Sequence, residues 1–151
     1  MVKIGDVVEF QTSIGKCYAI YTHKHVRYGA LLRVFEKIYK TRPKKIGDIV
    51  SNAVQFSCFF PLGSAVSKGI VTVVGNVAVP AEVAAFPIFR DGVADPRTGK
   101  VSVWWLWDGE KEWRVENLTP EQRKMPIRGI WNDTLLIERV ISGWTSDSDN
   151  R

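Results

Sequence analysis

The chain has 151 residues, of which 45% are hydrophobic and 25% charged, a composition typical of one globular domain that needs no disulfide or metal staple. The absence of an apolar signal segment after Met1 and of any long uncharged run argues against secretion and membrane insertion, so we expect a cytoplasmic protein. Six tryptophans and an aromatic content of 11% favour a β-rich fold. We predict a single domain over residues 1–144 and a polar, flexible tail over 145–151.

The net charge of +5 is concentrated in the N-terminal part of the chain. Residues 1–45 carry ten Lys and Arg against three Asp and Glu, whereas residues 46–151 have a slight acidic excess. Such asymmetry indicates either an acidic partner or a solvated, lysine-rich strand and loop. The basic surface that this stretch would form comprises Lys24, Arg27, Arg33, Lys37, Lys40, Arg42, Lys44 and Lys45.

The first half of the chain predicts a series of short strands. Residues 6–11 alternate as a strand, residues 16–21 and 26–36 read as the next two, and His23 and His25 lie at the bend between these. The segment 30–39 also suits a helix. Residues 48–52 suit a short helix capped by Asp48, and residues 54–60 form an apolar strand that Pro61 ends.

The second half predicts more strands, then helices. Gly75-Asn76 separates two β-branched strands, 69–74 and 77–79, and residues 80–100 read as a long irregular connection. Thr119 and Gln122 have capping-box spacing, and a final helix begins at Asn132 or Asp133 and ends at Gly143. We therefore predict an α+β fold: a β-rich domain with a curved, mostly antiparallel sheet, suited to a small partial barrel, and a C-terminal helix.

The segment Val101–Val115 predicts a hairpin, because Asp108-Gly109 separates two runs rich in aromatic and β-branched residues. A two-residue loop would pair Trp107 with Glu110 and Trp104 with Trp113. Trp104 and Trp113 would then belong to a core face. The opposite face would set two further tryptophans among charged residues and form a partner-binding surface of Trp105, Trp107, Glu110, Glu112 and Arg114.

Two interpretations of Trp105 and Trp107 remain open at this point. They are either buried under the 80–100 connection or the final helix, or exposed as an interaction patch. Exposed tryptophans are among the side chains most often found as binding hot spots.

No constellation in the sequence predicts catalysis, a metal site or a cofactor. His23 and His25 lack a third ligand, and Cys17 and Cys58 lie in apolar runs typical of buried, inert thiols. Glu110, Glu112 and Glu116 have strand spacing, but Arg114 intervenes, which favours a solvated charged face. The glycines of residues 63–69 lack the order of a phosphate-binding loop and indicate a turn.

Several short segments are spread over most of the chain: the opening strand Gly5–Phe10 with the aromatic strand Tyr18–Tyr21, the tryptophan strand Trp104–Trp107, and the closing helix Leu135–Val140. Together they resemble a family of small bacterial immunity proteins, the immunity-protein family numbered twenty-six. The resemblance implies a non-catalytic cytoplasmic protein that neutralises a toxin by binding it. Inhibitors of nucleases tend to be acidic, so a charge of +5 points to a toxin that is acidic or is not a nuclease.

The sequence thus predicts a binding protein with no enzymatic activity and a protein partner, such as a toxin domain. The alternative is a nucleic-acid-binding domain that uses residues 24–45, with Tyr28 and Tyr39 as stacking groups. A hydrolase assembled from distant residues ranks third.

Overall fold

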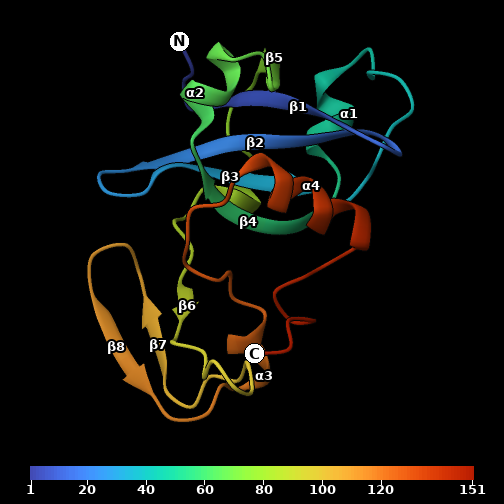
Figure 1. Cartoon of the computed structure of the whole chain (residues 1–151). Helices are drawn as coiled ribbons and strands as arrows, with labels where there is room; N and C mark the ends of the chain where they lie inside the picture. Colours follow the sequence, from blue (N-terminus) through green and yellow to red (C-terminus); the bar gives the residue numbers. More distant parts are fainter.

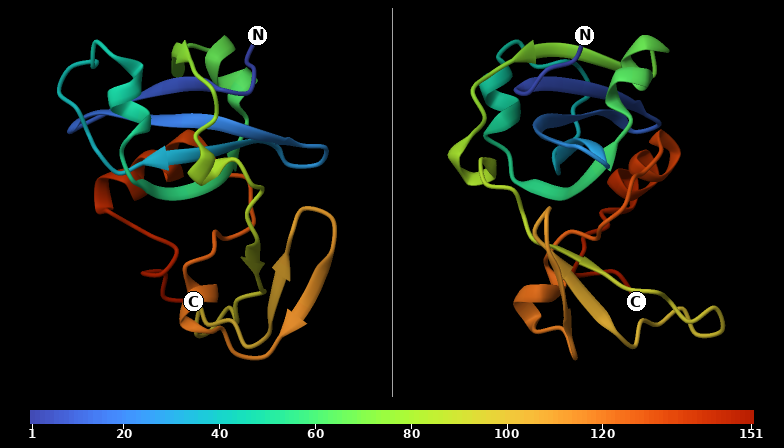
Figure 2. Two further views of the ribbon diagram at one scale, coloured as in Figure 1. Left: turned by 180° about the vertical axis from the view of Figure 1, so that it is seen from behind. Right: turned by 90° about the vertical axis from the view of Figure 1, so that its left-hand side faces the viewer.

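Two antiparallel sheets organise the computed structural model, which describes residues 1–151 (Figure 1). The large sheet has the order β4-β3-β2-β1-β5, and its strands are β1 (Asp6–Thr12), β2 (Gly15–His25), β3 (Gly29–Phe35), β4 (Val54–Phe60) and β5 (Val71–Asn76). The small sheet has the order β6-β7-β8, with β6 (Phe89–Asp91), β7 (Trp104–Trp107) and β8 (Glu112–Val115). The predicted α+β class and curved sheet are confirmed, and the large sheet is open rather than a closed barrel (Figure 2).

One face of the large sheet carries the main core. Strand alternation places Val8, Phe10, Leu32 and Val34 on this face. They pack against two helices, α2 (Leu62–Ser67) and α4 (Asp133–Ser142), which contribute Leu62, Leu136 and Val140 among others. Helices α2 and α4 therefore cover most of this first face.

The second face of the large sheet is covered in two separate parts. Near one end, Val7, Tyr18, Ile20 and Phe35 pack against Ile49 of α1 (Ile46–Val50). Near the other end, Leu31 and Phe59 pack against Phe89 and Trp107 of the small sheet. The cluster of Leu31, Phe59, Phe89 and Trp107 therefore joins the two sheets.

The final helix has the ends that its sequence predicts. The Asn132 side chain accepts a hydrogen bond from the Leu135 N–H at 2.8 Å, and Gly143 adopts a left-handed φ of 69° at the C-cap. The capping box at Thr119 and Gln122 also forms, at the start of α3 (Pro120–Arg123). Within this helix, Leu136 and Val140 are buried, whereas Ile141 is exposed.

Several local expectations differ from the structure. The ambiguous segment after Gly29 is strand β3, and β2 runs on through both histidines, so the bend falls at residues 26–28. The expected turn at residues 63–69 belongs largely to helix α2, and α1 begins at Ile46 with no side-chain cap. Residues 77–79 form no strand, and the 80–100 connection contains both the short 3-10 helix η1 (Ala81–Val83) and strand β6.

The C-terminal tail packs against the rest of the chain instead of extending from it as a flexible segment (Figure 1). Ser146 and Asp149 are buried, and the Ser146 carbonyl accepts a hydrogen bond from Arg90 at 2.6 Å. Arg90 is completely buried, and its guanidinium stacks on Trp104 at 4.7 Å. The Ser146 carbonyl thus accepts from a buried side chain, which places this part of the tail against the small sheet.

No helix of this chain is both long and apolar enough to cross a membrane.

Candidate functional site

The hairpin forms where the sequence predicts it, but its register is shifted by two residues. Trp104 lies opposite Val115, and Trp107 lies opposite Glu112. Residues 108–111 form the loop because the Asp108 carboxylate accepts hydrogen bonds from the N–H groups of Glu110 and Lys111, at 2.9 and 2.8 Å. These backbone donors, that of Lys111 first, lower the pKa of Asp108.

The shift by two residues preserves the division of side chains between the two faces, because side chains alternate with a period of two. Burial, however, differs from the prediction on both faces. Trp113 was expected in the core and is 38% exposed, whereas Trp107 was expected on the binding surface and is buried. Trp104 is buried and Trp105 is 38% exposed, as the hairpin argument predicts.

Trp107 is buried because residues distant in sequence surround it. Its ring lies 5.4 Å from Phe89, 5.8 Å from Phe86 and 4.9 Å from His25, measured between ring centroids. Two of these neighbours come from the 80–100 connection and the third from β2. Burial under that connection, the competing interpretation of the two tryptophans, therefore holds for Trp107 and not for Trp105.

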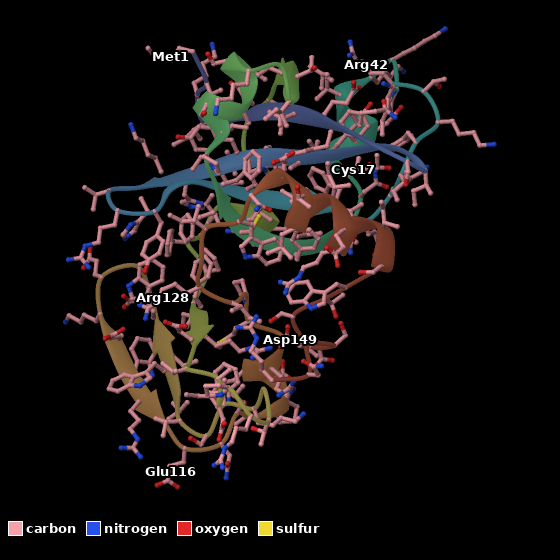
Figure 3. The ribbon with its side chains drawn as sticks, in the orientation of Figure 1. Met1, Cys17, Arg42, Glu116, Arg128 and Asp149 are labelled. Atoms are coloured by element: carbon pink, nitrogen blue, oxygen red, sulfur yellow. The ribbon has the colours of Figure 1, made fainter.

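Arg128, labelled in Figure 3, links the charged face of the hairpin to strand β6. Its guanidinium forms ion pairs with Asp91 at 2.6 Å and Glu112 at 2.9 Å and lies 5.1 Å from the centre of the Trp107 ring. Glu112 is thus engaged within the chain. Of the five predicted binding residues, Trp105, Glu110 and Arg114 are exposed and free of such pairs.

Strand β8 forms an open edge of the small sheet. The Asp108 N–H donates to the Lys111 carbonyl across the loop, so by alternation Leu106–Trp113 and Trp104–Val115 are the hydrogen-bonded pairs of the two strands. The backbone N–H and C=O groups of Glu112 and Arg114 therefore point away from β7. The opposite edge, at β6, is closed by hydrogen bonds between Arg90 and the segment at Pro126 and Arg128.

The predicted basic residues do not form one surface. Lys24 and Arg27 lie at the β2–β3 turn, whereas the other exposed cations lie in the loop after β3, about 20 Å away along the seven-residue strand. Arg42, in this second group, lies at the far end of the molecule from the hairpin base at Glu116 (Figure 3). The second group comprises Lys37, Lys40, Arg42, Lys44 and Lys45.

Arg42 is bound to a buried carboxylate. It donates to Glu9 at 2.8 and 3.1 Å, and the Tyr18 hydroxyl donates to the same carboxylate at 2.6 Å. The hydrogen bonds from Arg42 hold the pKa of Glu9 at about 2, although burial acts in the opposite direction. The two tyrosines proposed for stacking are also engaged, since Tyr39 packs on Tyr18 and Tyr28 packs on Trp107.

Arg33 is buried, unlike the other residues of the predicted basic surface. It lies between Leu31 and Phe35 on the second face of the large sheet and is 7% exposed. Its guanidinium donates to Thr22 Oγ1 at 3.2 Å, Ser57 Oγ at 3.5 Å and the Ala85 carbonyl at 3.0 Å. Its position inside an otherwise apolar strand is the sequence signal for its burial, although charge alone places it among the surface cations.

The hydrogen-bond partners of the two histidines indicate which ring nitrogen carries the proton. His23 Nε2 lies 2.9 Å from the Ala84 carbonyl, so it carries the proton, and Nδ1 accepts from the Thr22 hydroxyl at 2.8 Å. His25 Nε2 donates likewise to the Gly109 carbonyl. Both rings therefore link segments of the fold and have no free nitrogen that faces a common ligand.

Neither thiol is placed for nucleophilic chemistry. Cys17 and Cys58 are both buried and unpaired, and burial raises the pKa of the Cys17 thiol to about 12 and that of Cys58 further. No group of three or more His, Cys, Asp or Glu side chains is arranged to hold a metal ion.

No family model, no curated protein and no solved structure matches this chain. The resemblance to the immunity-protein family numbered twenty-six stays a prediction. The segments that carry it correspond to β1, the middle of β2, β7 and α4.

Proposed function

We propose that this chain is a non-catalytic protein-binding module whose partner docks on the open edge and flanking tryptophans of the β7–β8 hairpin. The observation that supports this most is the position of two half-exposed tryptophans beside an unpaired strand. Trp105 and Trp113 are each 38% exposed, and they lie on opposite faces of the hairpin. Trp113 belongs to the edge strand itself, and Trp105 lies on β7, across from Arg114 of the edge strand.

Addition of a strand to β8 uses physical features that the hairpin already has. The outward N–H and C=O groups of Glu112 and Arg114 would pair with an extended segment of the partner. Main-chain hydrogen bonds supply affinity in this binding mode, and side chains beside the edge supply specificity. Trp105, opposite Arg114 on one face, provides an apolar contact next to a charge.

The partner class follows from the family resemblance. As a member of the immunity proteins, the chain would bind a bacterial toxin domain in the cytoplasm and neutralise it. The net charge of +5 lies in residues 1–45 and not in the hairpin, so it favours the approach of an acidic partner by long-range attraction only. The nucleic-acid alternative receives less support, because the basic residues are divided between two ends of the large sheet and Arg33 is buried.

The experiment first asks whether the gene next to this one encodes a toxin domain, and then measures the binding of that domain to the full chain by calorimetry. Trp105→Ala should weaken binding at least about 30-fold, since truncation of a hot-spot anchor costs about 2 kcal/mol or more. Ile14→Ala, an exposed apolar residue at the distant β1–β2 turn, is the matched control and should leave the affinity unchanged.

A second pair of variants tests the open edge itself. Arg114→Pro removes an N–H that points away from β7, so it blocks strand addition without removing a hydrogen bond inside the hairpin. Arg114→Ala removes only the side chain. Strand addition predicts a much larger loss of affinity for the proline variant than for the alanine variant. Wild-type affinity in Trp105→Ala, Trp113→Ala and Arg114→Pro together would refute the proposed surface.

A further inference from the structure

A cavity of about 440 Å³ lies between the large sheet and the C-terminal tail. The tail runs from α4 back towards α3 and forms the outer wall (Figure 1). Arg33 and the start of β4 form the inner wall, and Lys124, at the end of α3, forms part of the rim. This volume falls within the range of small-molecule sites in proteins.

Arg33 brings a buried positive charge to this cavity. All three of its hydrogen-bond acceptors, Thr22, Ser57 and the Ala85 carbonyl, are neutral, and no carboxylate lies within 4.0 Å of it. Burial lowers the pKa of Arg33 to about 10, so the guanidinium remains charged at neutral pH. A buried charge without a counterion is costly, and an anion that reached it would be bound strongly.

The remaining lining residues determine the net charge and the apolar surface of the cavity. Lys124 is exposed and has no carboxylate within 4.0 Å, and Asp147 is the single acidic residue of the lining, which leaves one net positive charge. Val54, Phe56 and Trp144 supply an apolar wall. Such a lining is complementary to one negative charge attached to an apolar group.

Arg33 also lines a second cavity, of about 700 Å³. There Glu82 offsets the arginine and no lysine is present, so that lining has no net charge. The cavity with Lys124 is therefore the better anion site.

We propose that the cavity between β4 and the C-terminal tail binds a small monocarboxylate, whose carboxylate is held by Arg33 and Lys124 and whose apolar part packs against Trp144. The site is separate from the hairpin edge, so it does not depend on the proposed protein partner. The ligand class follows from the net charge of the lining, which matches a monoanion.

Binding is tested on the full chain with sodium acetate and sodium phenylacetate at constant ionic strength, by calorimetry and by the ¹H–¹⁵N signal of the arginine Nε groups. Both probes should bind saturably and shift one arginine signal, that of Arg33. Phenylacetate should bind about tenfold more tightly than acetate, because burial of its ring adds apolar contact.

Two surface variants give opposite expectations without disturbing the core. Lys124→Gln should weaken phenylacetate binding about five- to tenfold, and Asp147→Asn should strengthen it, because the first removes an attractive charge and the second a repulsive one. Lys44→Gln removes the same charge from the distant loop after β3 and should have no effect.

Arg33→Gln should abolish saturable binding in protein whose circular dichroism shows it folded. If Arg33→Gln unfolds, the phenylacetate affinities of Lys124→Gln and Asp147→Asn still test the proposal. The proposal is overturned if phenylacetate does not saturate, or if Lys124→Gln and Lys44→Gln bind it equally well.

Discussion

The imidazole of His25 donates a hydrogen bond from Nε2 to the carbonyl oxygen of Gly109, 2.7 Å away, and so joins β2 to the loop of the β7–β8 hairpin. Its Nδ1 accepts from the N–H groups of Arg27 and Tyr28, at 3.1 and 3.3 Å. The hairpin loop is thereby held against the large sheet. Trp107 fills the space beneath this contact.

The burial of the hairpin tryptophans predicts two classes of variant. Trp104→Ala and Trp107→Ala should each lower the free energy of unfolding by roughly 3–5 kcal/mol, because each leaves a cavity in a packed cluster. Trp105→Ala and Trp113→Ala should cost about 1 kcal/mol, as expected for half-exposed side chains. Urea unfolding of the four variants measures the difference. A loss at Trp113 as large as that at Trp107 would contradict this packing.

The neutral state of His23 predicts a dependence of stability on pH. Burial lowers its pKa below the ordinary value of 6.5, and Thr22 and Ala84 already satisfy the neutral ring. The unfolded chain therefore takes up a proton more readily than the folded one, so stability is lost as the pH falls below about 6.5. Thermal melts between pH 5 and 7.5 should show a smaller decrease for His23→Gln than for the wild type. Parallel curves would exclude His23 as the cause.

Glu9 predicts a second loss of stability at lower pH. Its folded-state pKa of about 2 lies below the ordinary value of 4.5, chiefly because Arg42 donates to the carboxylate. The ionised carboxylate thus contributes stability that is fully present above about pH 4.5 and is lost as the pH falls towards 2. Glu9→Gln should cost roughly 1.5–3 kcal/mol at pH 7, the range for hydrogen bonds to a charged group.

The same variant has a distinctive acid response. Glu9→Gln should lose less stability than the wild type between pH 5 and 2, since no carboxylate remains there to protonate. Urea unfolding at the two pH values measures this. An unchanged acid sensitivity would mean that other carboxylates dominate.

The packed C-terminal tail predicts that truncation is destabilising. Deletion of residues 146–151 removes the Ser146 carbonyl that accepts from Arg90 and the Asp149 carboxylate that accepts from the Trp144 indole. The free energy of unfolding should fall by roughly 1–3 kcal/mol, because donors buried under the tail lose their acceptors. Hydrogen exchange should also increase in β6. A truncated chain as stable as the full one would restore the expectation of a free tail.

Features that depend on neighbouring residues were predictable from the sequence alone. The alternation of Val8 and Phe10 indicates β1, and the caps at Asn132, Gly143 and Thr119 define helix ends, because each signal acts within a few residues of itself. The position of the hairpin was predictable for the same reason. Its register was not, because the Asp108 carboxylate binds two N–H groups of its own loop and lengthens it to four residues.

Only the tertiary structure decided which hairpin tryptophans are exposed and which arginine is buried. Trp107 is buried because His25, Phe86 and Phe89 meet over it, and nothing within the hairpin distinguishes it from Trp105. Likewise Arg33 lies within the basic stretch of the sequence, but β4 and the 80–88 segment enclose it. Burial is a property of contacts between distant segments, so the sequence by itself determined the strands, the caps and the charge, and the folded chain determined which of these residues a partner can reach.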